Sequence, residues 1–194
     1  MTAQVQGLQR FDWGLNTTLS LALAGLHRGD RVGVGVFDRQ IHTWIPPERG
    51  QHHLNRLIDK LTPIQPELLE SDYLGAVTHV VKQQSRRALV VIITDLVDIT
   101  ASSELLAALT RLAPRYLPFC VTLADPQVDK LAHTLTENVT QSYIRAVALD
   151  LLAQRQLAFA QLKQKGVLVL DAPANQISEQ LVDRYLQLKA RNQL

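Results

Sequence analysis

Four segments of the sequence that have the composition of strands end in an aspartate, and these carboxylates are the first candidates for chemistry. They are Asp38, Asp95, Asp125 and Asp171. In an open parallel sheet, ligands bind in the crevice beyond the carboxyl ends of the strands. Carboxylates gathered there repel each other unless a cation or a proton relieves them, so the pattern favours a hard divalent ion held by oxygen ligands.

Aspartate is also common in turns that follow strands and at helix N-caps, and we expect that structural role for Asp38, Asp125 and Asp171. Asp95 differs because it ends the most apolar segment, ALVVIITD at 88–95. We expect this strand to be central in the sheet and buried on both faces. Asp95 is therefore the strongest single candidate for a ligand.

The loop at Ser71 and Asp72 is the second place where oxygen ligands gather. Both residues come directly before an apolar pattern with helical spacing over 73–83. Taken alone, this pair is typical of a helix N-cap. The loop therefore leaves two interpretations open, a helix start and a ligand position.

Other motifs give little support to catalysis. Gly33 and Gly35 lie inside a strand, so they do not form a dinucleotide-binding fingerprint. The adjacent His52 and His53 lack a matching cluster of metal ligands, and Cys120 lies in an apolar strand as a small buried hydrophobe. The sequence contains no nucleophile elbow, and we expect the protein not to be an enzyme.

The elements that must position these residues alternate between strands and helices. Helices are predicted over 12–26, 52–61, 73–83, 103–112, 141–165 and 178–190, and strands over 31–37, 40–45, 88–95, 117–125 and 167–171. Pro46-Pro47 should end the second strand, which suits an antiparallel strand at the sheet edge. The alternation indicates one α/β domain over 1–194, Rossmann-like, with a doubly wound, mostly parallel sheet and helices on both faces.

Composition limits the class of protein further. The chain has 194 residues, of which 46% are hydrophobic, so it can bury one sizeable core. Its 20 Lys and Arg against 18 Asp and Glu give a net charge of +2, too small for a nucleic-acid binder held by phosphate contacts. No apolar run approaches the ~18 residues of a membrane span. The single cysteine and the lack of a secretory signal pattern indicate the cytoplasm.

Several segments together resemble the bacterial domain-of-unknown-function 58 (DUF58) proteins, which contain a von Willebrand factor type A-like domain. They are Phe11-Asp12-Trp13, GDRVGVGVF at 29–37, PPERG at 46–50, ESDY at 70–73, RRALVVIITDL at 86–96 and RYLQLKAR at 184–191. Their order and spacing resemble the family from about Asp12 to the C-terminus. The resemblance implies a metal-ion-dependent adhesion site (MIDAS), in which Mg²⁺ or Mn²⁺ is held by oxygens from three loops and by a carboxylate of a partner protein.

The resemblance also assigns residues to that metal site. Ser71 matches the hydroxyl of the second loop, Asp95 matches the aspartate of the third loop, and Asp72 is a neighbour that supports them through hydrogen bonds. Such domains open with a central strand and a first loop of the Asp-x-Ser-x-Ser or Asp-x-Gly-Arg kind, and Met1 matches the position just after it. The resemblance therefore implies an N-terminally truncated domain that binds Mg²⁺ or Mn²⁺ weakly. It further implies unpaired edges on the strands 31–37 and 88–95, and hence self-association of the chain.

Two functions from different classes remain. The leading hypothesis is a non-enzymatic, metal-dependent protein-interaction module, because the family is similar to accessory proteins of MoxR-type AAA ATPases in protein-complex assembly or maturation. Full-length relatives often carry N-terminal membrane segments, which would lie upstream of Met1 here. The alternative is a Mg²⁺-dependent phosphohydrolase or phosphoacceptor domain that uses the strand-end aspartates.

Overall fold

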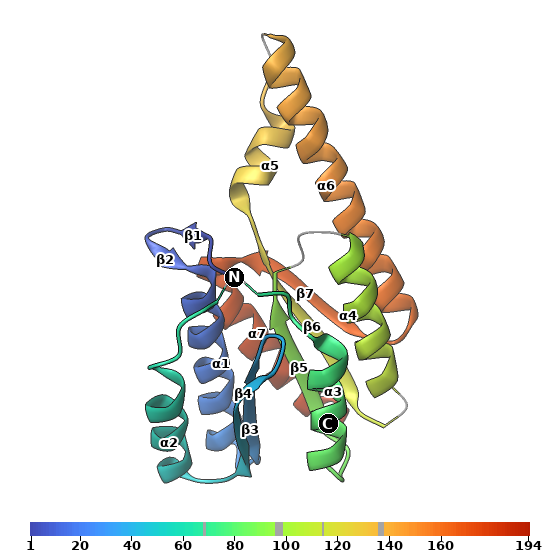
Figure 1. The fold of residues 1–194 in the computed structure, drawn as a ribbon. Coiled ribbons are helices and arrows are strands. Elements are labelled where there is room, and N and C mark those ends of the chain that lie inside the picture. The colour runs from blue at the N-terminus through green and yellow to red at the C-terminus, as the bar shows by residue number, and fades with distance from the viewer. Residues whose placement is uncertain (68, 96–98, 114, 136–137) are drawn as a thin grey trace.

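A three-stranded parallel sheet forms the centre of the fold (Figure 1). The computed structural model describes residues 1–67, 69–95, 99–113, 115–135 and 138–194. Strands β5 (Leu89–Thr94), β6 (Leu117–Ala124) and β7 (Leu168–Pro173) follow one another across the sheet, and both pairs of neighbours are parallel. Together with the helices around it, this sheet confirms the predicted α/β class.

Helices cover both faces of the sheet. α4 (Ile99–Leu112) and α6 (Val139–Gln164) pack on the face that carries Ile92 and Cys120, next to α3 (Tyr73–Gln83). α1 (Arg10–His27) and α7 (Ala174–Ala190) pack on the opposite face, which carries Phe119 and Val121. No helix of the described residues has both the length and the apolar character that crossing a membrane requires.

A second, antiparallel sheet precedes the parallel one. It consists of β3 (Val32–Phe37) and β4 (Ile41–Glu48), and within the described residues neither strand is hydrogen-bonded to β5. α1 and α2 (Gln51–Leu61) pack on the face that carries Val34 and Ile45. We predicted that the antiparallel strand lies at the edge of one continuous sheet, and it lies instead in a separate hairpin.

The central strand is β6, whereas the sequence pattern favoured β5. Every residue of β6 from Pro118 to Leu123 is buried, but in β5 only Ile92 and Thr94 are. β6 has a neighbour on each side, while β5 pairs with β6 alone among the described strands. The prediction that this strand is central and buried on both faces is therefore wrong, since Val90 and Val91, which point to opposite faces, are both partly exposed.

Cys120 lies in the middle of β6 and is fully buried, as predicted for a small hydrophobe. Burial raises the pKa of its thiol to about 12. The thiolate, which is the reactive form of cysteine, is therefore absent at neutral pH.

The strand β4 continues through Pro46 and Pro47 to Glu48, past the end that we predicted. Pro46 and Pro47 fall in an irregularity of the register with β3, between the pairs Val32–Glu48 and Val34–Ile45, so their missing N–H groups lie where the ladder is already interrupted. Gly33 on β3 leaves room for the close approach of Pro47 and Ile45 on β4. A Cβ there would lie 2.9 Å from Pro47 Cγ and 3.0 Å from the carbonyl oxygen of Ile45.

Other boundaries also differ from the prediction. The short strands β1 (Gln4–Val5) and β2 (Leu8–Gln9) and the helix α5 (Pro126–His133) were not predicted. α5 begins with an aspartate N-cap followed by proline, which is an ordinary helix start. The helix α1 begins at Arg10, before the predicted start at Asp12, which matters for the site described below.

Asp30 ties α7 to the turn before β3. The Tyr185 hydroxyl and the Lys189 ammonium both donate to its carboxylate. Burial acts to raise the pKa of Asp30, but the hydrogen bonds from Lys189 and Tyr185 outweigh it and lower this pKa. The contact therefore favours the ionised carboxylate in the folded chain.

The Asp30 contact predicts a dependence of stability on pH. Because the folded pKa is lowered, the stabilisation is present above the unfolded pKa of about 3.9 and is lost as the pH falls through the folded pKa. Asp30→Asn should lower the free energy of unfolding at pH 7 by about 1 kcal/mol or less, given its partial exposure. Urea unfolding at pH 7 and at about pH 3 should show the difference shrinking, and the exposed Asp183→Asn on α7 serves as the control.

The central position of β6 predicts unequal effects of the same substitution on two strands. Val121→Asn should lower the free energy of unfolding by about 3 kcal/mol or more, because it buries an unpartnered amide and leaves a void. Val91→Asn, on the partly exposed β5, should cost about 1 kcal/mol. Urea titrations compare the two, and equal losses would contradict the assignment of β6 as the centre.

Candidate functional site

Arg10, the first residue of α1, joins two of the predicted strand-end aspartates. Its side chain is 8% exposed and reaches the carboxyl ends of β5 and β6. Its Nη2 lies 2.5 Å from Asp125 Oδ2, and its Nη1 lies 3.8 Å from Asp95 Oδ2. The Met1 ammonium lies 3.3 Å from the same oxygen of Asp95. Two positive groups therefore balance two carboxylates at this edge of the sheet.

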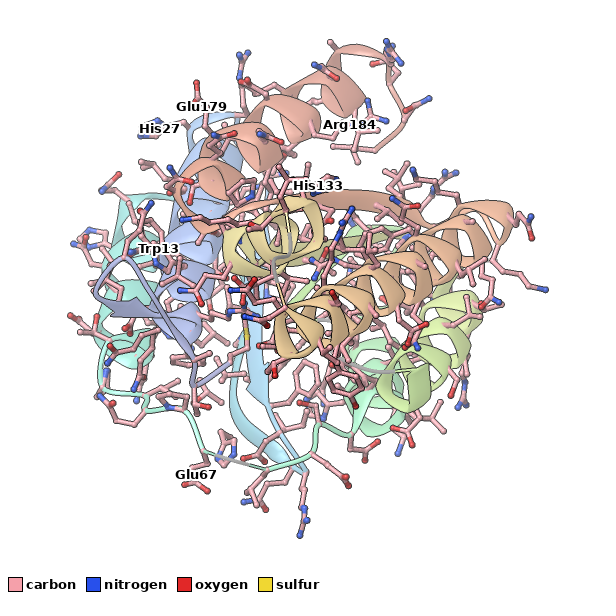
Figure 2. The ribbon with its side chains drawn as sticks, turned by 90° about the horizontal axis from the view of Figure 1, so that it is seen from above. Trp13, His27, Glu67, His133, Glu179 and Arg184 are labelled. Atoms are coloured by element: carbon pink, nitrogen blue, oxygen red, sulfur yellow. The ribbon has the colours of Figure 1, made fainter. Side chains whose placement is uncertain are left out.

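The N-terminal segment holds Arg10 in this position. The Arg10 N–H donates to the carbonyl of Ala3 over 2.8 Å. The indole N–H of Trp13, one turn further along α1, donates to the carbonyl of Val5 over 3.1 Å, next to the β1–β2 hairpin (Figure 2). A positive side chain at a helix N-terminus is disfavoured by the helix dipole, so the two carboxylates are what stabilise Arg10 there.

Ser71 and Asp95, two of the predicted metal ligands, both act on the hydroxyl of Tyr73. This hydroxyl lies 2.7 Å from Thr94 Oγ1, and the pair is buried. Burial raises the pKa of Tyr73, hydrogen bonds with Thr94 and Ser71 oppose that rise, and the charge of Asp95 adds to it. The hydroxyl is therefore neutral at physiological pH, and it fixes the start of α3 to the end of β5.

Asp72, the third predicted ligand, caps α3. Its Oδ1 accepts the N–H of Gly75 over 2.7 Å, and its own N–H donates to the carbonyl of Asp38 over 2.8 Å. A side chain at Gly75 would collide with the Asp72 carboxylate, so it would have to displace this cap. The helix-start interpretation of this loop is confirmed.

Asp38 and Asp125 have the structural roles that we predicted. Asp38 Oδ1 accepts the N–H of Gln40 in the turn between β3 and β4, and the other oxygen lies 2.5 Å from His42 Nε2. The hydrogen bond from His42 lowers the pKa of Asp38. Asp125 caps α5 by accepting the N–H of Gln127, in addition to its pairing with Arg10.

Asp171 does not end its strand, in contrast to the prediction, because β7 continues to Pro173. The hydroxyl of Thr122 on β6 donates to its Oδ1 over 2.9 Å, and the guanidinium of Arg155 on α6 pairs with the same oxygen. This carboxylate therefore joins two strands and a helix within the sheet layer.

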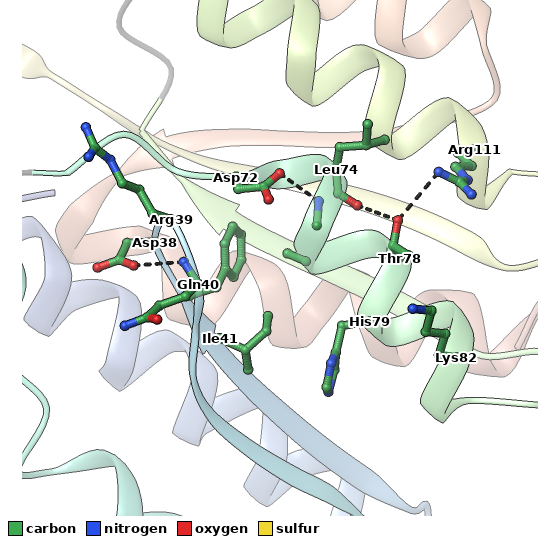
Figure 3. Close-up of a pocket in the computed structure, with 13 residues that line it drawn as sticks. Asp38, Arg39, Gln40, Ile41, Asp72, Leu74, Thr78, His79, Lys82 and Arg111 are labelled. Carbon is green, nitrogen blue, oxygen red and sulfur yellow. Dashed lines mark hydrogen bonds between the residues drawn. The ribbon is translucent and has the colours of Figure 1, made fainter.

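A cleft of about 480 Å³ opens between the β3–β4 turn and α3 (Figure 3). Asp38 and Asp72 lie at the end where α3 begins, while Lys82 and Arg111 contribute positive charge further along. Asp72 also precedes Tyr73, whose hydroxyl contacts Thr94 at the end of β5.

The hydroxyl that lines this cleft is not arranged for nucleophilic attack. Thr78 Oγ1 donates its proton to the carbonyl of Leu74 over 2.7 Å and accepts a long contact of 3.5 Å from Arg111 Nη1. His79 packs edge-on against the ring of Trp44, with centroids 4.9 Å apart. A general base would have to face the hydroxyl proton, and here a backbone carbonyl does.

The predicted metal ligands do not fit a tightly held divalent ion in this arrangement. Such an ion would have to compete with Arg10 and the Met1 ammonium for Asp95, while one oxygen of Asp72 is engaged in capping. The part of the chain that the structure describes contains no group of three His, Cys, Asp or Glu side chains placed to hold a metal. Metal binding by Ser71, Asp72 and Asp95 stays a prediction.

Arg10 is the site residue that sequence reasoning missed. It precedes the apolar pattern of α1, so periodicity placed it outside the helix. One signal could have found it, since an arginine in the first turn of a helix opposes the dipole and indicates an acidic partner. The partner itself could not be identified, because Asp125 lies 115 residues further along the chain.

A protein-family model with the description "Protein of unknown function DUF58" matches residues 9–155. The chain belongs to the DUF58 family. The matched range contains the Arg10 ion pairs, the loop at Ser71 and Asp72, and the cleft of this DUF58 chain. Comparisons with curated proteins and with solved structures gave no match.

The position of Arg10 predicts the response to Mg²⁺. The unaltered chain should bind Mg²⁺ in the millimolar range or more weakly, because Arg10 already balances Asp95 and Asp125. Arg10→Gln should lose stability, since it removes the cation paired with Asp125 and one of the two positive groups near Asp95, and added Mg²⁺ should restore part of the melting temperature.

Thermal melts with and without millimolar Mg²⁺ measure this response, and the double variant with Asp95→Asn is the control that should not respond. Micromolar Mg²⁺ binding by the unaltered chain, abolished by Asp95→Ala, would show that Arg10 does not exclude the ion.

Proposed function

We propose that this DUF58 chain is a non-enzymatic protein-interaction module that works beside a MoxR-type AAA ATPase in the assembly or maturation of protein complexes. The observation that supports this most is the pairing of Arg10 with Asp95 and Asp125. Both of these strand-end carboxylates have the guanidinium as a partner within the chain. The edge of the sheet that would carry hydrolysis is thus charge-balanced within the chain itself.

The cleft beside α3 is the surface that we assign to the partner. Lys82 and Arg111 offer positive charge on two different helices, and at the other end the carboxylates of Asp38 and Asp72 lie beside Arg39. A partner segment with the opposite arrangement of charges would gain specificity and a faster association rate. The hydrogen bonds of Asp72 and Tyr73 hold the wall of this cleft in place before any partner arrives.

The proposal has three further parts. A parallel sheet between two helical layers supports a von Willebrand factor A-like architecture. Mg²⁺ or Mn²⁺ at Ser71, Asp72 and Asp95 would bind weakly and would modulate the interaction rather than create it. The chain would meet such an ATPase in the cytoplasm.

The test is direct binding between the purified chain and a MoxR-type ATPase from the same genome, followed by biolayer interferometry. Arg111→Glu and Lys82→Glu should each weaken the affinity by about 10-fold or more, because each reverses a charge in the cleft. Lys60→Glu, which reverses an exposed charge on α2, is the matched control and should bind as the unaltered chain does.

The phosphohydrolase alternative makes a different prediction. Turnover of phosphate esters with Mg²⁺, lost in Asp95→Asn, would overturn the interaction module. Equal binding by Arg111→Glu, Lys82→Glu and Lys60→Glu would also count against the cleft as the docking surface.

A further inference from the structure

The helix α6 carries its first half away from the body of the protein, accompanied only by α5 (Figure 1). Of its 26 residues, Ala148 and Leu162 alone are buried. Ala132 of α5 is buried as well, and the Arg145 guanidinium donates to the Ala132 carbonyl over 3.0 Å. Asn138 caps α6 by accepting the N–H of Gln141. The projecting helix pair is therefore fixed in shape.

Large apolar side chains cover one side of this projection. Val139, Tyr143, Val147 and Leu151 recur every four residues and form a continuous strip, which we call the α6 stripe. Val139 is 87% exposed and Tyr143 is 72% exposed. Further exposed apolar side chains border the stripe at Leu135, Ile144 and Leu157.

This surface is larger than a monomer ordinarily exposes. The seven side chains present on the order of 700 Å², whereas the largest patch on a typical monomer is about 300–600 Å². A standard interface buries about 800 Å² on each partner, so the α6 stripe and its border nearly supply one alone. By contrast, no exposed large apolar side chain among the described residues lies on β3 or β5.

We propose that a second copy of this chain covers the α6 stripe in an antiparallel, two-fold symmetric pair. Val147 then lies on the two-fold axis and faces its own copy. In this register Tyr143 of one copy lies opposite Leu151 of the other. The Tyr143 hydroxyl can then reach the carboxylate of Asp150 on the other copy. Leu157 of one copy lies between the positions of Leu135 and Val139 of the other.

The register makes the stripe complementary to itself. Val147 meets its own copy, and Tyr143 and Leu151 exchange places across the axis, which is the condition for a two-fold interface, while Val139 lies opposite position 155. Asp150 lies beside the stripe, where its Oδ2 already accepts a hydrogen bond from Gln154 Nε2 over 2.6 Å. The antiparallel arrangement adds a hydroxyl donor near this carboxylate and does not place a second carboxylate opposite it. The net charge of +2 on each chain adds little repulsion between copies. The pairing thus differs from the self-association through strand edges that the sequence predicted.

The test is sedimentation of the intact chain over a range of micromolar concentrations. The unaltered chain should approach twice its mass of 21.7 kDa. Val147→Glu should weaken the association about 100-fold or more, because two like charges meet on the axis. Leu149→Glu, on the opposite side of the same helix, is the matched control and should dimerise normally.

A mixture of two variants tests the register itself. Val147→Glu and Val147→Lys should each be monomeric alone and should form a mixed dimer together, because opposite charges then meet on the axis. Circular dichroism checks that both remain folded, as expected for substitutions at an exposed helical position.

Two outcomes overturn the proposal. One is a monomeric unaltered chain at these concentrations. The other is a dimer that survives Val147→Glu, which would point to the strand edges. Because no ATPase takes part, the result is independent of the proposed function.

Discussion

The carboxyl edge of the parallel sheet depends on one guanidinium group held between two carboxylates. Asp95 and Asp125 end neighbouring parallel strands, where without a cation their charges would repel each other. Arg10 can meet both because its planar head group offers separate nitrogens to separate acceptors. Since Arg10 also opens α1, the same contact positions this helix on the sheet. The ion pairs of Arg10 therefore balance the charges of Asp95 and Asp125 and also fix the start of α1 on the sheet.

The first turn of α3 connects the two sheets that the fold keeps apart. Tyr73 binds Thr94 at the end of β5, while the preceding residue, Asp72, donates its N–H to Asp38 at the end of β3. The ring of Phe37 packs edge-on against Tyr73, with centroids 5.9 Å apart. The cleft lies beside this junction, so its shape follows from hydrogen bonds that also hold the sheets in relation to each other.

The sequence was sufficient for those features that local patterns control. Apolar spacing predicted most helices, and the apolar runs predicted the parallel strands, because both patterns report which side chains meet the core. The cap at Asp72 and the turn at Asp38 were predictable for the same reason, since each side chain bonds to backbone within three residues.

The rest depended on pairing between distant segments, which such patterns do not contain. β5 and β6 are both apolar, so composition could not tell which of them has two neighbours. Pro46-Pro47 indicated the end of a strand, but Gly33 on the facing strand gives the prolines room. Arg10 was missed because its role depends on its ion pair with Asp125, which follows a strand far away in the sequence.

The burial of Cys120 has a consequence for how the protein responds to oxidants. Its sulfur lies at the centre of the sheet, and its raised pKa keeps it as the unreactive thiol. Peroxides and disulfides react with accessible thiolates, so Cys120 should resist the first step of cysteine oxidation. Because Cys120 is the only cysteine in this sequence, the sequence offers no accessible thiol for a redox signal. A change in the thiol balance of the cell would leave its fold and its surfaces as they are.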